Sequence, residues 1–424
     1  MKEPKFNKWN SWDPLETVIL GSCYTADFFR EVANPKIRSA MSKICNETCE
    51  DLEHFENVLK DFGSTVIKPV IDPNDSVMNY VDDSGKVSIT HFNHTGKDKI
   101  PYPPLQPRNH HIVIGNDIFY SSDFFDEQEP EITNLVKQYS CNNSHYFNFF
   151  QSQQHAEQYR ALPENKFNEL ANSNWKTYHE YKNDPDYFQK LTPEVRKEIN
   201  LYQNVNYDYI VTDGPRFTQI GKDLYYNTWQ KPLDLYVQQI INEMYPQLRL
   251  NYICHEGDHS DGCFSALKEG VMLSLCDIQN YDVTFPDWDV FFLPDQETAL
   301  LKLANYRKMK NKARGKFWVP GEEENDEFIH YVNTWLDHWL GYCQESAFDI
   351  NVLSLDENHV CLLNNNKELT QFCKKHKIEP IHVPMRHKYF WDGGLSCYTL
   401  DLKRKGTMQN YFPDRQIGII DSII

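Results

Sequence analysis

Short apolar runs interrupted by a polar turn recur along the chain. An apolar run, a break at Gly, Asn, Asp, Glu or Lys, and a second apolar run are typical of two strands joined by a tight turn. The pattern occurs at residues 111–120, 217–226, 264–274 and 351–363. Further apolar runs lie at residues 17–21 and 395–402, near the two ends. The pattern predicts several short strand pairs.

Segments with helical spacing lie between these units. In residues 40–61, apolar residues recur roughly at helical spacing: Ile44, Leu52, Phe55, Val58 and Leu59. Residues 233–245, 326–342 and 366–376 show a similar pattern. Strand pairs that alternate with helices indicate an α/β protein. Their spacing is too uneven for a solenoid.

The chain is predicted to form a single domain over residues 1–424, because no linker rich in Gly, Ser or Pro divides it. Two stretches depart from the alternation of strand pairs and helices. Residues 142–206 are polar and rich in Asn, Gln and Tyr, and residues 287–324 carry a basic patch followed by an acidic run. We expect both to be insertions or surface loops, and the basic patch to be a solvated face.

Charge and cysteine content narrow the class of protein. The net charge of -18 argues against a nucleic-acid or anionic-membrane partner. The first residues resemble no targeting peptide, and no window approaches 18 consecutive apolar residues. The eleven cysteines are odd in number and form no C-x-x-C pair, which favours reduced thiols over a disulfide framework. A cytoplasmic location is therefore expected.

The segment DGGLSC, which ends at Cys397, is the first candidate for chemistry. Two glycines precede a cysteine at the start of an apolar run. Glycines permit positive φ angles and close approach of the backbone to a ligand. A cysteine on such a turn suits a covalent nucleophile, which needs activation and access. By itself, the motif also fits an inert strand cysteine after a glycine turn.

The segment CHEGDHSDGC, residues 254–263, is the second candidate, and three interpretations compete. His255, Glu256 and His259 spell H-E-x-x-H, but that zinc motif needs a helix, and Gly257 and Asp258 interrupt it. A structural zinc site of Cys and His is the second interpretation, although its spacing matches no standard framework. The third is a loop at a strand end, in which His259 moves protons and Asp261 pairs with a cation.

Together the two segments resemble the glycine/inosamine amidinotransferase family, of the guanidine-modifying pentein superfamily. WDPLETVILG resembles W-D-P-L-E-x-V-I-V-G, and PRNHHIVIGNDI resembles P-R-D-x-x-x-V-x-G-N-E-I. HSDGCF resembles H-I-D-A-T-F, and GGLSCYTLDLKRKG resembles G-G-F-H-C-x-T-x-D-x-R-R-x-G. These motifs occur in the family's order between residues 12 and 412.

The resemblance implies a pentein-type propeller, built from ββαβ units with five-fold pseudo-symmetry around a central active site. It assigns Cys397 as nucleophile, His259 as general acid/base and Asp261 as a guanidinium-binding carboxylate. The implied reaction transfers an amidino group from an arginine-like guanidine donor to an amine acceptor through amidino-Cys397. The implied partners are these two small molecules. No cofactor or metal is expected, and a homodimer is left open.

Two departures from the family pattern alter the expected charge of the site. Asn109 stands where the family has the aspartate of P-R-D, and Arg216 stands at a second carboxylate position. Asp213, three residues before Arg216, is a substitute carboxylate if the loop shifts. An inward-facing Arg216 would repel a guanidinium and suit a carboxylate or phosphate. Two alternatives therefore stay open: a cysteine hydrolase of the same fold with an altered, anionic substrate, and a non-catalytic binding protein.

Overall fold

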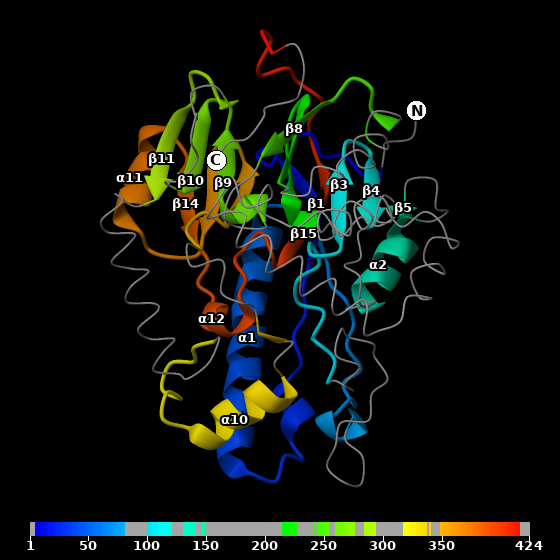
Figure 1. Ribbon diagram of the computed structural model, residues 1–424, viewed down its shortest axis with the longest axis vertical. Helices are drawn as coiled ribbons and strands as arrows, with labels where there is room; N and C mark the ends of the chain where they lie inside the picture. The colour runs from blue at the N-terminus through cyan, green and yellow to red at the C-terminus, as the bar shows by residue number, and fades with distance from the viewer. Residues whose placement is uncertain are drawn as a thin grey trace, which may run out of the picture.

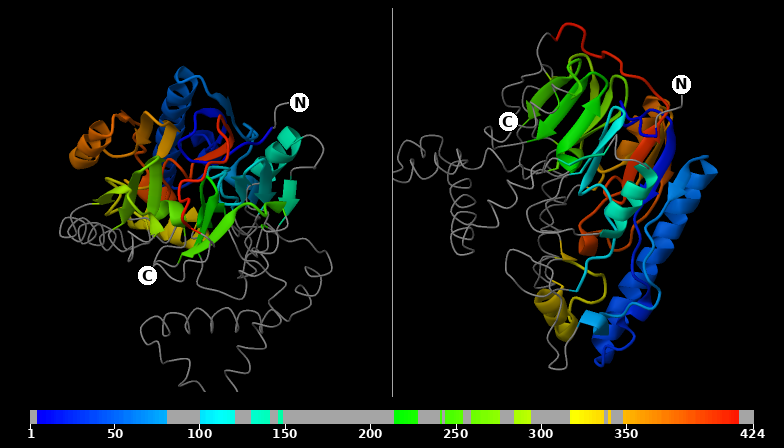
Figure 2. Two further views of the ribbon diagram at one scale, coloured as in Figure 1. Left: turned by 90° about the horizontal axis from the view of Figure 1, so that it is seen from above. Right: turned by 90° about the vertical axis from the view of Figure 1, so that its right-hand side faces the viewer.

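Short sheets and helices alternate along the chain in the computed structural model, which confirms the α/β class (Figure 1). The structure describes residues 5–80, 100–120, 130–140, 146–148, 214–227, 241, 244–253, 259–275, 284–293, 317–336, 339–340 and 348–415. The sheets gather at one end of the long axis, and the long helix α1 (Pro35–Asp61) extends from them toward the other end. Two further views show the same arrangement (Figure 2).

Five three-stranded sheets form within these residues, and all share one plan. In each, the central strand pairs antiparallel with one neighbour and parallel with the other. The strands, sheet by sheet, are β1 (Leu15–Leu20), β2 (Thr65–Ile67) and β15 (Thr399–Arg404); β3 (His111–Ile114), β4 (Asp117–Tyr120) and β5 (Tyr146–Asn148); β6 (Phe217–Ile220), β7 (Asp223–Asn227) and β8 (Arg249–Ile253); β9 (Phe264–Lys268), β10 (Val271–Leu275) and β11 (Asp289–Leu293); and β12 (Leu353–Asp356), β13 (His359–Leu362) and β14 (Glu379–His382).

The four predicted strand–turn–strand units are confirmed as the hairpins β3–β4, β6–β7, β9–β10 and β12–β13. The turns explain part of the sequence pattern. Gly115 and Gly221 both have φ of 59° in two of these turns, a conformation that side chains disfavour. The apolar runs at the two ends of the chain meet in one sheet, where β1 pairs with β15. This pairing brings the strand after Cys397 beside the N-terminal strand.

Helices connect or flank the sheets. Besides α1 they are α2 (Pro130–Ser140), α10 (Asp326–Trp335), α11 (Lys367–Lys375) and α12 (Lys388–Trp391), with 3-10 turns η1 (Ala26–Phe29), η2 (Val77–Tyr80), η4 (Gly214–Arg216) and η5 (Ser260–Gly262). The helices predicted at residues 40–61 and 366–376 are confirmed as α1 and α11. The one predicted at 326–342 is shorter, because α10 ends at Trp335. Most of residues 233–245 lie outside the described part of the chain.

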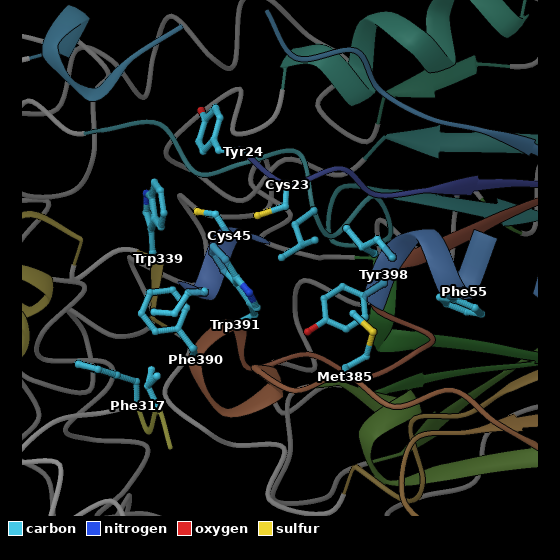
Figure 3. Packing of buried hydrophobic residues seen from close by; sticks show 14 of the residues in the cluster. Cys23, Tyr24, Cys45, Phe55, Phe317, Trp339, Met385, Phe390, Trp391 and Tyr398 are labelled. Atoms are coloured by element: carbon cyan, nitrogen blue, oxygen red, sulfur yellow. The ribbon is translucent and has the colours of Figure 1, made fainter. Parts of the chain in front are cut away.

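The sequence of α1 accounts for its start and its buried face. Pro35 occupies the first turn, and the Asn34 side chain caps the helix by accepting hydrogen bonds from the amides of Lys36 and Ile37. The buried residues recur every three or four positions and enter the largest core cluster (Figure 3). The same cluster includes Trp391 of α12, and Trp391 donates a hydrogen bond to Thr48 of α1. The core thus fixes α12, which leads into the Cys397 turn.

Strands occur inside both stretches expected to be insertions. β5 lies within residues 142–206, and β11 lies within residues 287–324. The rest of 142–206 and residues 294–316 lie outside the described residues. β5 was not predicted, because it has only three residues, too few for a periodic pattern, and because the sequence around it is polar. In the described part of the chain, no helix has the length and apolar character needed to cross a membrane.

His111, the first residue of β3, makes the stability of the fold sensitive to pH. It is fully buried, and this burial lowers the pKa of His111 to about 3. The unfolded chain binds a proton at this ring near pH 6.5. Between those values only the unfolded state is protonated, so stability falls as the pH falls through that window.

We expect His111→Phe to reduce this pH dependence, since phenylalanine keeps an aromatic ring beside Tyr120 and cannot titrate. Between pH 7 and pH 4 the parent should lose about 3 kcal/mol more of its free energy of unfolding than the variant. Urea unfolding at both pH values measures the difference. Equal losses in the two proteins would show that His111 titrates normally.

Candidate active site

Cys397 lies in a turn between α12 and β15 that hydrogen bonds hold closed. The amide of Tyr398 donates to the carbonyl of Gly394 at 3.2 Å, and that of Thr399 donates to Ser396 at 3.2 Å. The Thr399 hydroxyl donates to the carbonyl of Leu395 at 3.0 Å. The Cys397 side chain is only 2% exposed. The turn therefore gives the sulfur a defined position below the surface.

The glycines before Cys397 serve close packing and not positive φ. The left-handed residue is Asp392, with φ of 50°, whereas neither Gly393 nor Gly394 has a positive φ. A Cβ atom on Gly394 would lie 2.6 Å from the Cβ and Oδ1 atoms of Asn351. A Cβ atom on Gly393 would lie 2.8 Å from the side-chain nitrogen of Gln106. The expectation that these glycines supply backbone freedom is thus wrong: they leave room for two neighbouring side chains.

We expect Gly394→Ala to destabilise the protein by about 1–3 kcal/mol, because the new methyl group must displace the base of the Asn351 side chain. Gly393→Ala is the matched control, and its first conflict is with the far end of a flexible glutamine. Urea unfolding of both variants measures the costs. A control variant as unstable as Gly394→Ala would contradict this steric explanation.

Polar groups surround the turn. Asn351, in the loop before β12, donates a hydrogen bond from Nδ2 to the Cys397 sulfur at 3.1 Å. Ser396 donates from its hydroxyl to Oδ2 of Asp261 at 2.9 Å. Arg108 donates to the Ser396 hydroxyl, and its Nε atom lies 3.5 Å from Oδ2 of Asp261. The turn thus lies against a buried network of an amide, a hydroxyl, a carboxylate and a guanidinium.

The Ser396–Asp261 hydrogen bond joins the two segments in which the sequence places chemistry. Asp261 lies in η5, and His259 occupies the N-cap position of that turn, where it is half-buried. Ser396 directly precedes Cys397. The bond therefore brings the backbone next to the sulfur and the backbone next to the imidazole into one region, although 135 positions separate its two residues in sequence.

The turn that carries Arg216 borders the same region. Arg216 is the half-buried last residue of η4, and η4 contacts η5. Ser260 strengthens this contact by donating its hydroxyl hydrogen to the carbonyl of Pro215 at 2.8 Å. Asp213 lies outside the described residues, as do His255 and Glu256 of the H-E-x-x-H match. The chain before that match, Arg249–Ile253, forms the strand β8 and not a helix.

The buried oxygen atoms that lack a hydrogen-bond partner among the described residues include Oδ1 of Asp261 and Oδ1 of Asn109. Asn109 follows Arg108, and its Nδ2 donates to Gln106 at 2.9 Å. Its carbonyl accepts from the amide of Gly214, beside η4. Buried acceptors without donors are costly. Each of these two oxygens can accept a hydrogen bond from an N–H group.

A cluster of buried charged side chains adjoins this network through Arg108. The buried ammonium of Lys8 is 3.2 Å from Asp401 of β15, and Arg404 donates to the same carboxylate at 2.8 Å. Burial opposes ionisation of Asp401, but Arg404, Lys8 and Arg108 together hold the pKa of Asp401 well below its usual range. Burial also lowers the pKa of Lys8 to about 8. Arg108 therefore belongs to a charged cluster that reaches from Asp261 to Asp401.

Sequence reasoning missed three residues of this region: Arg108, Asn351 and Ser396. Arg108 was visible only as the middle residue of the P-R-N segment, and Ser396 only as the neighbour of Cys397. Asn351 opens a predicted strand–turn–strand unit, where an asparagine gives no functional signal. No local pattern marks any of them, because their contacts depend on the packing of distant segments.

Comparisons with known proteins show similarity to amidinotransferases. No protein-family model matches the chain. It is 23% identical to mitochondrial glycine amidinotransferase of Xenopus tropicalis over 95% of this chain and 84% of that protein. It is 24% identical to the Gallus gallus protein of the same name over 97% of this chain and 86% of that protein.

Solved structures of amidinotransferases share the fold. An amidinotransferase of the saxitoxin biosynthetic pathway from Microseira wollei has a TM-score of 0.57 and 17% identity, covering 96% of this chain and 100% of its own. Inosamine-phosphate amidinotransferase from Streptomyces griseus has a TM-score of 0.57 and 14% identity, covering 96% of this chain and 99% of its own. The resemblance of this chain to the glycine/inosamine amidinotransferase family is thereby confirmed over nearly its whole length.

Proposed function

We propose that the protein transfers an amidino group from an arginine-like guanidine donor to an amine acceptor through a covalent amidino-Cys397 intermediate. The observation that carries the proposal is the buried hydrogen bond between Ser396 and Asp261, which links the nucleophile turn to the His259 turn. The similarity to glycine amidinotransferases supports the reaction class. The proposed setting is a single-domain propeller in the cytoplasm, with its five sheets related by five-fold pseudo-symmetry.

The first half-reaction forms a carbon–sulfur bond. The thiolate of Cys397 attacks the central carbon of the donor guanidinium, and the bond from that carbon to the donor's amine breaks. His259 protonates the departing amine, so the donor leaves as a neutral amine and an S-alkyl isothiouronium stays on the enzyme. For arginine the released amine is ornithine.

The second half-reaction reverses these steps with a new amine. His259, now neutral, removes a proton from the acceptor amine as its nitrogen attacks the isothiouronium carbon. The carbon–sulfur bond breaks and returns the thiolate of Cys397. If water attacks in place of the amine, the product is urea, and the protein is a hydrolase with the same nucleophile.

The unpartnered oxygens of Asp261 and Asn109 support a donor rich in N–H groups. A guanidinium presents several such donors in one plane. Of these two oxygens, only that of Asp261 belongs to a carboxylate. The other oxygen of this carboxylate, Oδ2, lies 3.5 Å from Nε of Arg108. The charges of Arg108 and Asp261 cancel, so the net charge of the pair is zero. We therefore expect the pair to attract a cation more weakly than an unpaired carboxylate would.

The neutralisation of the Asp261 charge by Arg108 favours one alternative: a cysteine hydrolase of the same fold with an altered, anionic substrate. Arg216, on the turn beside Asp261, would suit a carboxylate or phosphate group of such a substrate. A binding protein without turnover is the third candidate. Each of the three predicts a different set of products.

Product analysis separates them. The protein is incubated with arginine, with and without a panel of small amines that includes glycine, and the products are quantified by mass spectrometry. The proposal predicts ornithine together with the amidinated acceptor. Urea without an amidinated amine indicates hydrolysis of arginine through the same nucleophile, whereas a covalent adduct on Cys397 from a non-guanidine substrate indicates the hydrolase with an anionic substrate. The absence of any product from arginine and a wider panel of guanidines would refute amidino transfer.

A further inference from the structure

Asn351 makes a direct polar contact with the Cys397 sulfur. Its Nδ2 atom lies 3.1 Å from the sulfur, and both residues are buried. Its Oδ1 atom accepts from the amide of Ser396 at 2.8 Å and from the amide of Cys397 at 3.3 Å. One side chain thus contacts the sulfur and the two backbone amides that position it.

These contacts fix the orientation of the Asn351 amide. The backbone N–H groups of Ser396 and Cys397 can only donate, so the atom that faces them must be the oxygen. The NH₂ group must then face the sulfur. The usual ambiguity between the oxygen and nitrogen of an asparagine is absent at this position.

The backbone of Asn351 also contacts the turn. Its carbonyl accepts from the amide of Leu395 at 3.1 Å, inside the same turn. Gly394 leaves the space that the Asn351 side chain fills, since a Cβ atom there would lie 2.6 Å from it. The turn therefore contacts both the backbone and the side chain of Asn351.

We infer that Asn351 is a positioning residue that holds the Cys397 sulfur in place and stabilises its thiolate form. A hydrogen bond donated to an ionisable group favours the charged form when the donor suits the anion. In a buried site, where water is scarce, this donor replaces part of the lost hydration. The inference rests on the proposed role of Cys397 as nucleophile.

Asn351→Asp tests the donor while keeping the acceptor. An aspartate retains oxygens for the amides of Ser396 and Cys397, removes the N–H group that faces the sulfur and adds a negative charge beside it. Asn351→Ser removes the donor without adding charge. Asn34→Asp is the matched control, because Asn34 also accepts from two backbone amides but caps α1.

The readout is the rate at which iodoacetamide alkylates Cys397 as a function of pH, followed by peptide mass spectrometry. The alkylation of Cys361, a fully buried core cysteine, reports on unfolding within the same molecules. We expect Asn351→Asp to slow alkylation at pH 7 by about tenfold or more and to move the profile about one unit to higher pH. Asn351→Ser should lie between Asn351→Asp and the parent, and Asn34→Asp should match the parent.

A purely structural role for Asn351 predicts a different result. Loosening the turn would expose the thiol and speed its alkylation at every pH, without moving the profile. That outcome in either variant, or a parental profile in both, would overturn the inference. Because alkylation needs no guanidine substrate, a shifted profile without any amidino transfer would refute the proposed function and leave the role of Asn351 intact.

Discussion

Cys397→Ser should reduce amidino transfer by about 10⁴-fold or more, the largest effect expected from any single substitution. The hydroxyl is close in shape to the thiol and still offers an acceptor to the Nδ2 atom of Asn351, so the turn should keep its structure. It is a far weaker nucleophile, because a serine without strong activation stays protonated near neutral pH. Steady-state formation of the amidinated acceptor measures the loss.

Cys49→Ser is the control for that experiment. Cys49 lies on α1, is half-buried and contacts the carbonyls of Cys23 and Tyr24. It should keep the parental rate. Thermal unfolding of both variants confirms that they are folded. Parental turnover by Cys397→Ser would exclude Cys397 as the nucleophile, whatever the control shows.

His259→Ala should lower turnover by about 10²–10⁴-fold, the range expected when a general acid/base is lost. The amine that leaves an arginine-like donor is a poor leaving group unless a proton reaches it. Without the imidazole, the carbon–nitrogen bond should break slowly even though Cys397 is unchanged. Turnover measured over a range of pH values tests this, with exposed His54 replaced by alanine as the control.

A change of donor separates proton transfer from general damage to the site. An S-alkyl isothiourea releases a thiol, which departs without prior protonation. His259→Ala should therefore form the amidino-Cys397 intermediate from this donor at a rate close to the parental one, while arginine stays a poor donor. An equal loss with both donors would remove His259 from the proton-transfer step.

The fold was largely predictable because local patterns encode it. Strand pairs such as β3–β4 and β6–β7 are contiguous in sequence, with a glycine at the turn that needs positive φ. Their burial patterns follow directly from apolar runs. β5 and β11 each pair parallel with a strand that lies across a long connection in sequence. Nothing within a few residues of them reports that pairing.

The site was predictable only where a motif is compact. Cys397 and the His259–Asp261 segment stood out because several functional residue types cluster within a few positions. The network that joins them did not, since Arg108 meets Ser396 across 288 positions and Asn351 meets Cys397 across 46. Side chains that act through such contacts carry no local signature. The charge balance at Asp261 likewise became visible only when Arg108 was found beside it.

The central claim is that the Cys397 sulfur accepts an amidino group, and intact-protein mass spectrometry tests it most directly. The protein is incubated with arginine in the absence of an acceptor amine, quenched in acid and then digested to locate any modification. We expect a mass gain of one amidino group on the peptide that contains Cys397, and none in Cys397→Ser. An unmodified Cys397 after incubation with arginine and with an S-alkyl isothiourea, or the same adduct on a different residue, would contradict it.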